Sequence, residues 1–324
     1  MNKTTKKILK VSGIAAGAAA AASLSAYVTT KYLVNTALDR EPPRMMKKAD
    51  KLIAGAQKID PEFLSRAEEA SERLAAAENE TAKIVSQDGS LLVGHFIPCD
   101  NPRRVIIAVH GWRSSWHKDF GMIADFWRDN GCSVLYVEQR GQNNSEGAHM
   151  GFGLTERYDC LSWVNWVIGR CGSSLPIYLA GVSMGAATVL MASGLELPEN
   201  VHGIMADCGF TSPGAIWKHV AEKNLHMFYG MRGAIADALC RRKILVGSGE
   251  YSTVEALQHA TVPVLFVHGT DDHFVPVEMT YENYRACASP KRLLIVPGAD
   301  HGMSYFVEPA RYEATVKDFW RMCD

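Results

Sequence analysis

A serine flanked by two glycines is the feature that most constrains the fold of this chain. Gly181 and Gly185 bracket Ser183, directly after the apolar run Ile177–Ala180 and before a stretch rich in alanine and valine. This order predicts a strand that reverses sharply into a helix, because only glycine permits such close backbone approach on both sides of the turn. The turn would lift the serine hydroxyl clear of the sheet and place the Met184 amide beside it. The pattern predicts a nucleophilic serine, and an ordinary glycine-rich turn is the alternative.

Short apolar runs alternate with longer helical stretches from Arg104 to the end of the chain. This alternation is typical of right-handed βαβ units, and it predicts a mostly parallel sheet with helices on both faces. Before it, two apolar runs flank Asp88-Gly89, a hairpin signal, so antiparallel strands are expected to open the sheet. The predicted strands are 82–85, 91–97, 105–109, 133–137, 177–180, 203–206, 264–267 and 293–296. The predicted helices between and after them are 119–130, 155–170, 184–194, 277–286 and 309–322.

Composition divides the chain into three parts. Four lysines precede residues 11–30, which carry no charge and are rich in alanine. About twenty such residues can cross a bilayer, so residues 1–38 are predicted to be a signal anchor or transmembrane helix. A cleaved signal peptide, or an alanine-rich helix lying on the protein, is the alternative. Residues 39–80 are expected to form a connecting helical arm that includes a helix over 62–77, and residues 81–324 the catalytic domain.

The interval 211–260 is longer than an ordinary crossover between two strands. Connections that carry their own helices commonly form lids or binding elements, so we interpret it as a helical cap that sets substrate preference. A plain structural insertion is the alternative.

The anchor predicts a single-pass membrane protein whose catalytic domain lies outside the cytoplasm, with a secreted or a cytoplasmic protein as alternatives. Eight scattered cysteines do not favour this placement, because free thiols suit a reducing environment. They contain no CxxC pair and no zinc-type spacing, so neither a disulfide framework nor a metal site is predicted. A net charge of -1 argues against nucleic-acid binding. Neither a GxxxxGK[ST] loop nor a GxGxxG turn after a first strand is present, so no cofactor is predicted.

A serine nucleophile needs a base and an acid from other strand ends. His301 follows the last predicted strand in a glycine-flanked loop and is the best base. Asp272 follows the strand before it and is the preferred acid, whereas Asp271 is assigned to the turn. Asp207, at the end of another strand, is the competing acid. In a parallel sheet these loops meet at one edge.

The oxyanion donors are expected to be backbone amides. Met184 supplies one, and Trp112, in the loop opened by His110 and Gly111, supplies the other. His110 is interpreted as a structural histidine that supports this loop. Arg140 is interpreted as half of a buried ion pair and not as a catalytic group.

Together these motifs resemble the α/β-hydrolase superfamily, and most closely its bacterial membrane-anchored serine hydrolases, over about residues 80–323. The resemblance implies Ser183 as nucleophile, Asp272 as acid and His301 as base, with the Trp112 and Met184 amides as the oxyanion hole. One turn departs from the family pattern, with Gln142 and Asn143 where histidine and glycine are usual, and this leaves the local pocket shape open. The motifs are His110-Gly111, Arg140-Gly141, Gly181-Val182-Ser183-Met184-Gly185, Gly269-Thr270-Asp271-Asp272-His273-Phe274-Val275-Pro276 and Asp300-His301-Gly302.

The expected activity is hydrolysis of small-molecule carboxylic esters through an acyl-enzyme. A serine peptidase or an acyltransferase on the same fold is the alternative within enzymes. A catalytically idle, membrane-tethered binding module is the alternative outside them.

Overall fold

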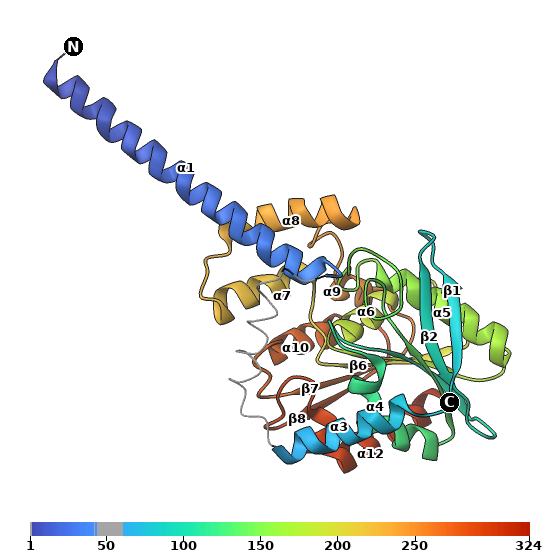
Figure 1. Cartoon of the computed structure of the whole chain (residues 1–324). Coiled ribbons are helices and arrows are strands. Elements are labelled where there is room, and N and C mark those ends of the chain that lie inside the picture. Colours follow the sequence, from blue (N-terminus) through green and yellow to red (C-terminus); the bar gives the residue numbers. More distant parts are fainter. Residues whose placement is uncertain (1, 42, 44–60) are drawn as a thin grey trace.

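The computed structural model describes residues 2–41, 43 and 61–324, and its centre is an eight-stranded sheet (Figure 1). The strand order is β1-β2-β4-β3-β5-β6-β7-β8. β1, β2 and β4 pair antiparallel, and every other pairing is parallel. The strands are β1 (Glu80–Val85), β2 (Leu91–Ile97), β3 (Arg104–Val109), β4 (Cys132–Val137), β5 (Ile177–Val182), β6 (Val201–Asp207), β7 (Val264–Gly269) and β8 (Lys291–Val296).

All eight predicted strands lie within observed ones, and each predicted helix overlaps an observed helix. One helix, α4, begins at Trp116 instead of Asp119, which places the Asp119 carboxylate in its first turn. The helices are α1 (Lys3–Leu38), α3 (Pro61–Ala75), α4 (Trp116–Asp129), α5 (Glu156–Cys171), α6 (Met184–Ala192), α7 (Pro213–His219), the π-helix η1 (Val220–Asn224), α8 (Gly230–Ile244), α9 (Thr253–Gln258), α10 (Val277–Ala286), α11 (Ser304–Val307) and α12 (Pro309–Cys323).

Two apolar cores lie on opposite faces of the sheet. Side chains alternate along each strand, so Val105, Ile107 and Val109 of β3 point into one core while Ile106 and Ala108 point into the other. The first core is completed by α5, α6, α9 and α10, and the second by α3, α4 and α12. A sheet buried on both faces explains why the central strands are nearly continuous apolar runs.

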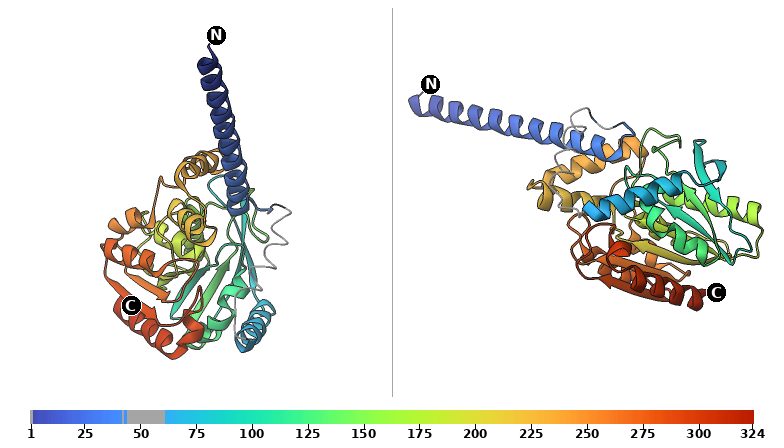
Figure 2. Two further views of the ribbon diagram at one scale, coloured as in Figure 1. Left: turned by 90° about the vertical axis from the view of Figure 1, so that its left-hand side faces the viewer. Right: turned by 60° about the horizontal axis from the view of Figure 1, so that its bottom comes forward.

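The helix α3 belongs to the residue range predicted to be an arm, and it packs closely against α4 (Figure 2). A Cβ on Gly121 of α4 would lie 2.7 Å from the backbone of Ala70 in α3, so the two helices touch where both residues are small. Leu74 of α3 reaches the core below. Residues 42 and 44–60 of the predicted arm lie outside the described residues.

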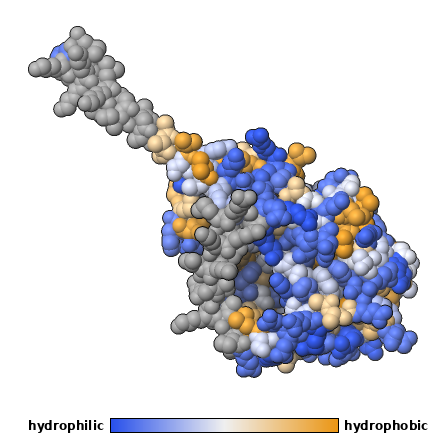
Figure 3. All heavy atoms as spheres, viewed as in Figure 1, coloured by the Kyte–Doolittle hydropathy of each residue, from blue (hydrophilic) through white to orange (hydrophobic). Residues whose placement is uncertain are grey.

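The helix α1 extends away from the body, and its last turns lie beside α8 (Figure 1). Ala26, Thr30, Val34 and Leu38 form one buried stripe on this helix, as expected for residues four apart. Figure 3 shows hydrophobic residues where α1 leaves the body and around α8, on an otherwise mostly hydrophilic face. No helix in the described part of the chain is both long enough and apolar enough to span a bilayer. Residues 11–30, which were predicted to cross a bilayer, lie within α1.

Candidate active site

The turn at Ser183 has the strained geometry that the flanking glycines predict. Ser183 takes φ 56° and ψ −117°, a conformation that L-residues rarely adopt. A Cβ on Gly181 would overlap the Gly185 carbonyl, and one on Gly185 would overlap the Val109 carbonyl of β3. Both glycines are therefore required for α6 to start directly at the end of β5. The result is a serine that is 9% exposed and faces a cavity.

Three side chains that are far apart in the sequence meet at this turn. Ser183 Oγ lies 2.9 Å from His301 Nε2, and His301 Nδ1 lies 2.7 Å from Asp272 Oδ2. Because the carboxylate can only accept, Nδ1 carries the proton and Nε2 is left to accept from the serine hydroxyl. This is the hydrogen-bond order of a serine, a base and an acid that orients the base.

The Asp272 carboxylate is held on both oxygens. Oδ1 accepts from the backbone N–H groups of Phe274 and Val275, at 2.9 and 2.8 Å. Oδ2 accepts from His301 and from Nε2 of the fully buried His268, which lies 3.1 Å away. His268 was not predicted from the sequence, although its position at the end of β7, four residues before Asp272, was a signal that could have found it. The His268 imidazole therefore helps to fix the position of the Asp272 carboxylate.

Electrostatics at this group favour the charged acid. Burial alone would raise the pKa of Asp272, but hydrogen bonds from His268 and His301 hold it below its ordinary value. Burial alone would lower the pKa of His301, and the neighbouring Cys208 sulfur and the Asp272 carboxylate hold it above its ordinary value instead. Burial raises the pKa of the Cys208 thiol to about 11, so that sulfur is neutral near pH 7 and Asp272 is the partner that matters.

The two competing carboxylates lie elsewhere. Asp207 accepts a hydrogen bond from the Ser304 hydroxyl at 3.1 Å, and burial raises its pKa to about 6. Asp271 is exposed and accepts from the hydroxyl of Thr270 at 2.7 Å, as expected for a turn residue. Neither carboxylate is hydrogen-bonded to His301 within the described residues.

The loop after β3 lies against the nucleophile, since a Cβ on Gly111 would be 3.4 Å from Ser183 Cβ. The backbone N–H of Gly111 donates to Asp119 Oδ2 at 2.6 Å, and the other oxygen of that carboxylate accepts from Ser114. This ties the loop to the first turn of α4. In the described part of the chain, the N–H groups of Trp112 and Met184 have no hydrogen-bond partner. They are therefore available to an oxyanion beside Ser183.

The residues that depart from the family pattern hold this same loop. Gln142 Oε1 accepts from the backbone N–H of Arg113 at 2.6 Å, and Asn143 donates to the Ser114 carbonyl at 3.0 Å. Nε2 of the buried His110 accepts from the Gln139 N–H, and its Nδ1 lies 2.8 Å from the Gly111 carbonyl oxygen. Both contacts are to the backbone, so His110 has a structural role. Gln142 and Asn143, whose effect on the local pocket shape the sequence left open, therefore hold the loop after β3 in place.

The interpretation of Arg140 as an ion-pair residue is confirmed. Its guanidinium donates two hydrogen bonds of 2.7 Å to Asp159 and one of 2.5 Å to Asp88. This buried pair lies outside the cavity that Ser183 faces.

The carboxyl end of α1 is attached to the loop after β3. Trp112 Nε1 donates to the Ala37 carbonyl at 2.9 Å. The Arg113 guanidinium donates to the carbonyl oxygens of Thr36, Asp39 and Arg40, at 2.8, 2.5 and 3.1 Å. The Thr36 and Ala37 carbonyls are in the last turn of α1, where a helix leaves its carbonyls without intrahelical partners, and Asp39 and Arg40 directly follow the helix. No feature of the sequence indicated that residues 1–38 contact the site, yet their last turn lies beside the candidate oxyanion loop.

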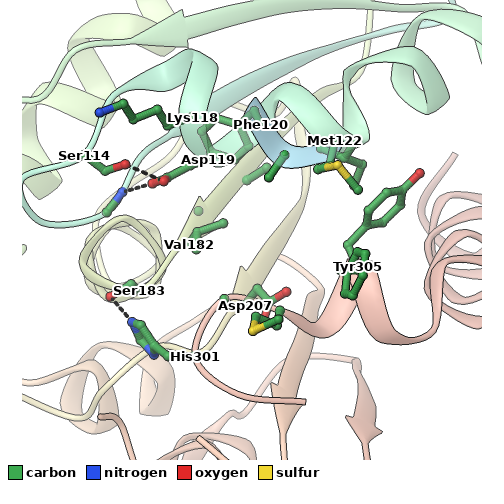
Figure 4. A pocket seen from close by; sticks show the side chains of 18 of the residues that line it. Ser114, Lys118, Asp119, Phe120, Met122, Val182, Ser183, Asp207, His301 and Tyr305 are labelled. Atoms are coloured by element: carbon green, nitrogen blue, oxygen red, sulfur yellow. Dashed lines mark hydrogen bonds between the residues drawn. The ribbon is translucent and has the colours of Figure 1, made fainter. Parts of the chain in front are cut away.

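A cavity of about 330 Å³ begins at Ser183 and His301. It passes under α4 and is walled by side chains of α3, α4, α11 and α12 together with the ends of β5 and β6. Figure 4 shows Ser183 and His301 at one end, with Met122 and Tyr305 at the other. Residues 211–260 contribute no side chain to it. That interval packs instead with α1, Trp112 and Met184.

All eight cysteines are free thiols. Within the described residues, one group of three side chains has metal-ligating atoms close together: Cys208, Asp272 and His301, all within 4.8 Å of one another. Asp272 and His301 already share a hydrogen bond there, so a metal could bind only by breaking it. These residues fit a proton relay better than they fit a metal centre.

The chain is similar to known hydrolases in sequence and in fold. A family model described as serine aminopeptidase, S33, matches residues 100–239. A Bacillus subtilis protein, YqkD, is 28% identical over 229 residues, which is 69% of this chain and 73% of that protein. An esterase from Pyrococcus furiosus, Pf2001, superposes with a TM-score of 0.61 at 20% identity, covering 78% of this chain and 95% of the esterase. A puromycin-hydrolysing peptidase from Mycobacterium tuberculosis superposes with a TM-score of 0.57 at 14% identity, covering 76% of this chain and 39% of the peptidase.

Proposed function

We propose that this chain, which has the α/β-hydrolase fold and is similar to α/β-hydrolases in sequence, is a serine hydrolase that cleaves carboxylic esters through an acyl-enzyme. The observation that carries the proposal is the continuous hydrogen-bond chain from Ser183 through His301 to Asp272.

In the first half of the reaction, His301 Nε2 takes the proton of Ser183 as the oxygen attacks the ester carbonyl. Asp272 keeps Nδ1 protonated and stabilises the imidazolium that forms. The negative oxygen of the tetrahedral intermediate is bound by the amides of Trp112 and Met184. The intermediate collapses when His301 returns the proton to the leaving alcohol. Ser183 then carries the acyl group.

In the second half, a water molecule takes the place of the alcohol. His301 removes its proton, the hydroxide attacks the acyl carbon, and the same two amides bind the second oxyanion. Collapse returns the proton to Ser183 Oγ and releases the carboxylic acid.

The test compares wild type with Ser183→Ala and with Ser193→Ala, a matched change at the other end of α6. With p-nitrophenyl esters, we expect Ser183→Ala to lose about 10⁴-fold or more in kcat. Ser193→Ala should keep wild-type turnover, because its hydroxyl bonds the Leu190 carbonyl and does not line the cavity. Near-wild-type hydrolysis by the folded Ser183→Ala variant would refute the proposal.

Amide hydrolysis is the second candidate, because the matching family model is described as a serine aminopeptidase and one structural neighbour is a peptidase. The same residues would perform it, with an amine as leaving group. Esters and aminoacyl amides with the same acyl group separate the two activities. A higher kcat/KM for the amide would favour the peptidase.

A further inference from the structure

We propose that the cavity under α4 is an acyl-chain subsite, and that the substrates are esters of unbranched acids with about six to ten carbons. The proposal rests on the serine hydrolase function above and names its substrate class. In this proposal, substrate preference is set by the walls of this cavity and not by the interval 211–260, which was predicted to set it.

The cavity has the walls of an apolar subsite. Trp127, Met205 and Val316 are buried and line its interior, while Met122 and Tyr305 lie at the end farthest from Ser183 (Figure 4). An alkyl chain gains free energy when it leaves water for such an apolar site. The gain corresponds to about a fourfold increase in affinity for each buried methylene.

Of the charged groups that line the cavity, Lys118 is exposed to solvent, and the three carboxylates have partners of their own. Asp119 accepts from the Gly111 N–H and the Ser114 hydroxyl, and Asp207 accepts from Ser304. Asp300 accepts from the backbone N–H groups of His301 and His273. These carboxylates are thus satisfied before a ligand enters. An apolar chain leaves those bonds in place.

The volume of the cavity sets the length of the acyl chain that it can hold. A water molecule takes up about 30 Å³ of the liquid, and a methylene group is of similar size, so about 330 Å³ holds roughly ten chain atoms. The helix α3 closes the far side. Phe63 of α3 lines the cavity and packs edge-on against Phe306 of α11, with ring centroids 4.5 Å apart.

The orientation follows from the nucleophile. Ser183 and His301 lie at one end, so an acyl carbon held on Ser183 directs its chain toward Met122 and Tyr305. An acid with a bulky branch beside the carbonyl would meet Val182, which lies between Ser183 and the interior. An unbranched chain fits this path.

The experiment measures kcat/KM for p-nitrophenyl esters from two to sixteen carbons. We expect a rise of roughly fourfold per methylene up to about eight carbons and a decline beyond about ten. Met122→Trp should shorten the optimum, with at least a roughly tenfold loss on the octanoate and little change on the acetate. Phe63→Ala should lengthen the optimum. Met231→Trp is the matched control, because Met231 is exposed on α8 and lines no part of the cavity.

Binding of octanoate and of butyrate to Ser183→Ala, followed by calorimetry, tests the subsite without turnover. Tighter binding of octanoate, lost in the double variant with Met122→Trp, supports the proposal. Equal binding of both acids, a profile unchanged by Met122→Trp, or a profile shifted by Met231→Trp would overturn it. If esters are hydrolysed at Ser183 with one of those results, only the subsite is wrong. If no ester is hydrolysed, the proposed function fails, and the calorimetry still decides the subsite.

Discussion

The attachment of α1 to the loop after β3 predicts that Arg113→Ala will slow catalysis from a position outside the proposed triad. Arg113 donates to three carbonyl oxygens at the end of α1, and its own backbone N–H is held by Gln142. A hydrogen bond to a charged group is worth about 1.5–3 kcal/mol when well sheltered. Arg113 is only partly buried, so we take about 1 kcal/mol for each bond, or about 3 kcal/mol in total.

That free energy couples the helix to the loop whose Trp112 amide is a proposed oxyanion donor. Complete loss of one such donor costs about 10²–10³-fold in kcat. A Trp112 amide that is displaced but not lost should reduce kcat by less. We expect a fall of about 10- to 100-fold in kcat, with KM nearly unchanged. The assay is steady-state hydrolysis of a p-nitrophenyl ester, together with limited proteolysis within residues 31–40 to detect release of α1.

The matched control is Arg128→Ala on α4, which removes exposed ion pairs with Asp125 and Asp129. It should leave kcat unchanged, since exposed pairs contribute little. Arg113→Lys should recover part of the lost kcat by restoring one charged donor. The reasoning is refuted if Arg113→Ala frees α1 to proteolysis while kcat stays within about twofold of wild type.

Two further predictions concern the triad and the turn. Because Asp272 holds the pKa of His301 above its ordinary value, wild-type kcat/KM should rise as pH increases through that raised pKa. In the pH–rate profile of Asp272→Asn, the rising limb should move to lower pH and the plateau should fall by about 10⁴-fold. Gly185→Ala should destabilise the fold by at least about 1–3 kcal/mol, because its Cβ overlaps the Val109 carbonyl, and chemical denaturation of that variant beside Gly169→Ala, where a Cβ meets open space, checks this.

Local sequence patterns predicted the sheet and the turn well. The strands are apolar runs bounded by glycine, proline or charge, and the Gly181-x-Ser183-x-Gly185 pattern permits few backbone paths. The order of strands then brings His301 and Asp272 to the edge where Ser183 lies, because parallel strands end on one side of the sheet.

Long-range contacts between irregular segments were not predictable in this way. No local signal connects Arg113 to the end of α1, about 75 residues earlier, because the contact uses backbone carbonyls that every residue has. The cavity was missed for a related reason. The shape of the cavity depends on how α3 packs against α4 at Ala70 and Gly121. This close approach is visible only in the folded structure.

The hydroxyl of Ser183 as nucleophile is the central claim, and a fluorophosphonate probe tests it most directly. The probe should add one covalent group to the wild-type protein, and mass spectrometry of the digested protein should find it on the peptide that contains Ser183. Labelling should be lost in Ser183→Ala and strongly slowed in His301→Ala, because the imidazole activates the hydroxyl. An adduct on any other residue, or equal labelling of the Ser183→Ala variant, would contradict the account.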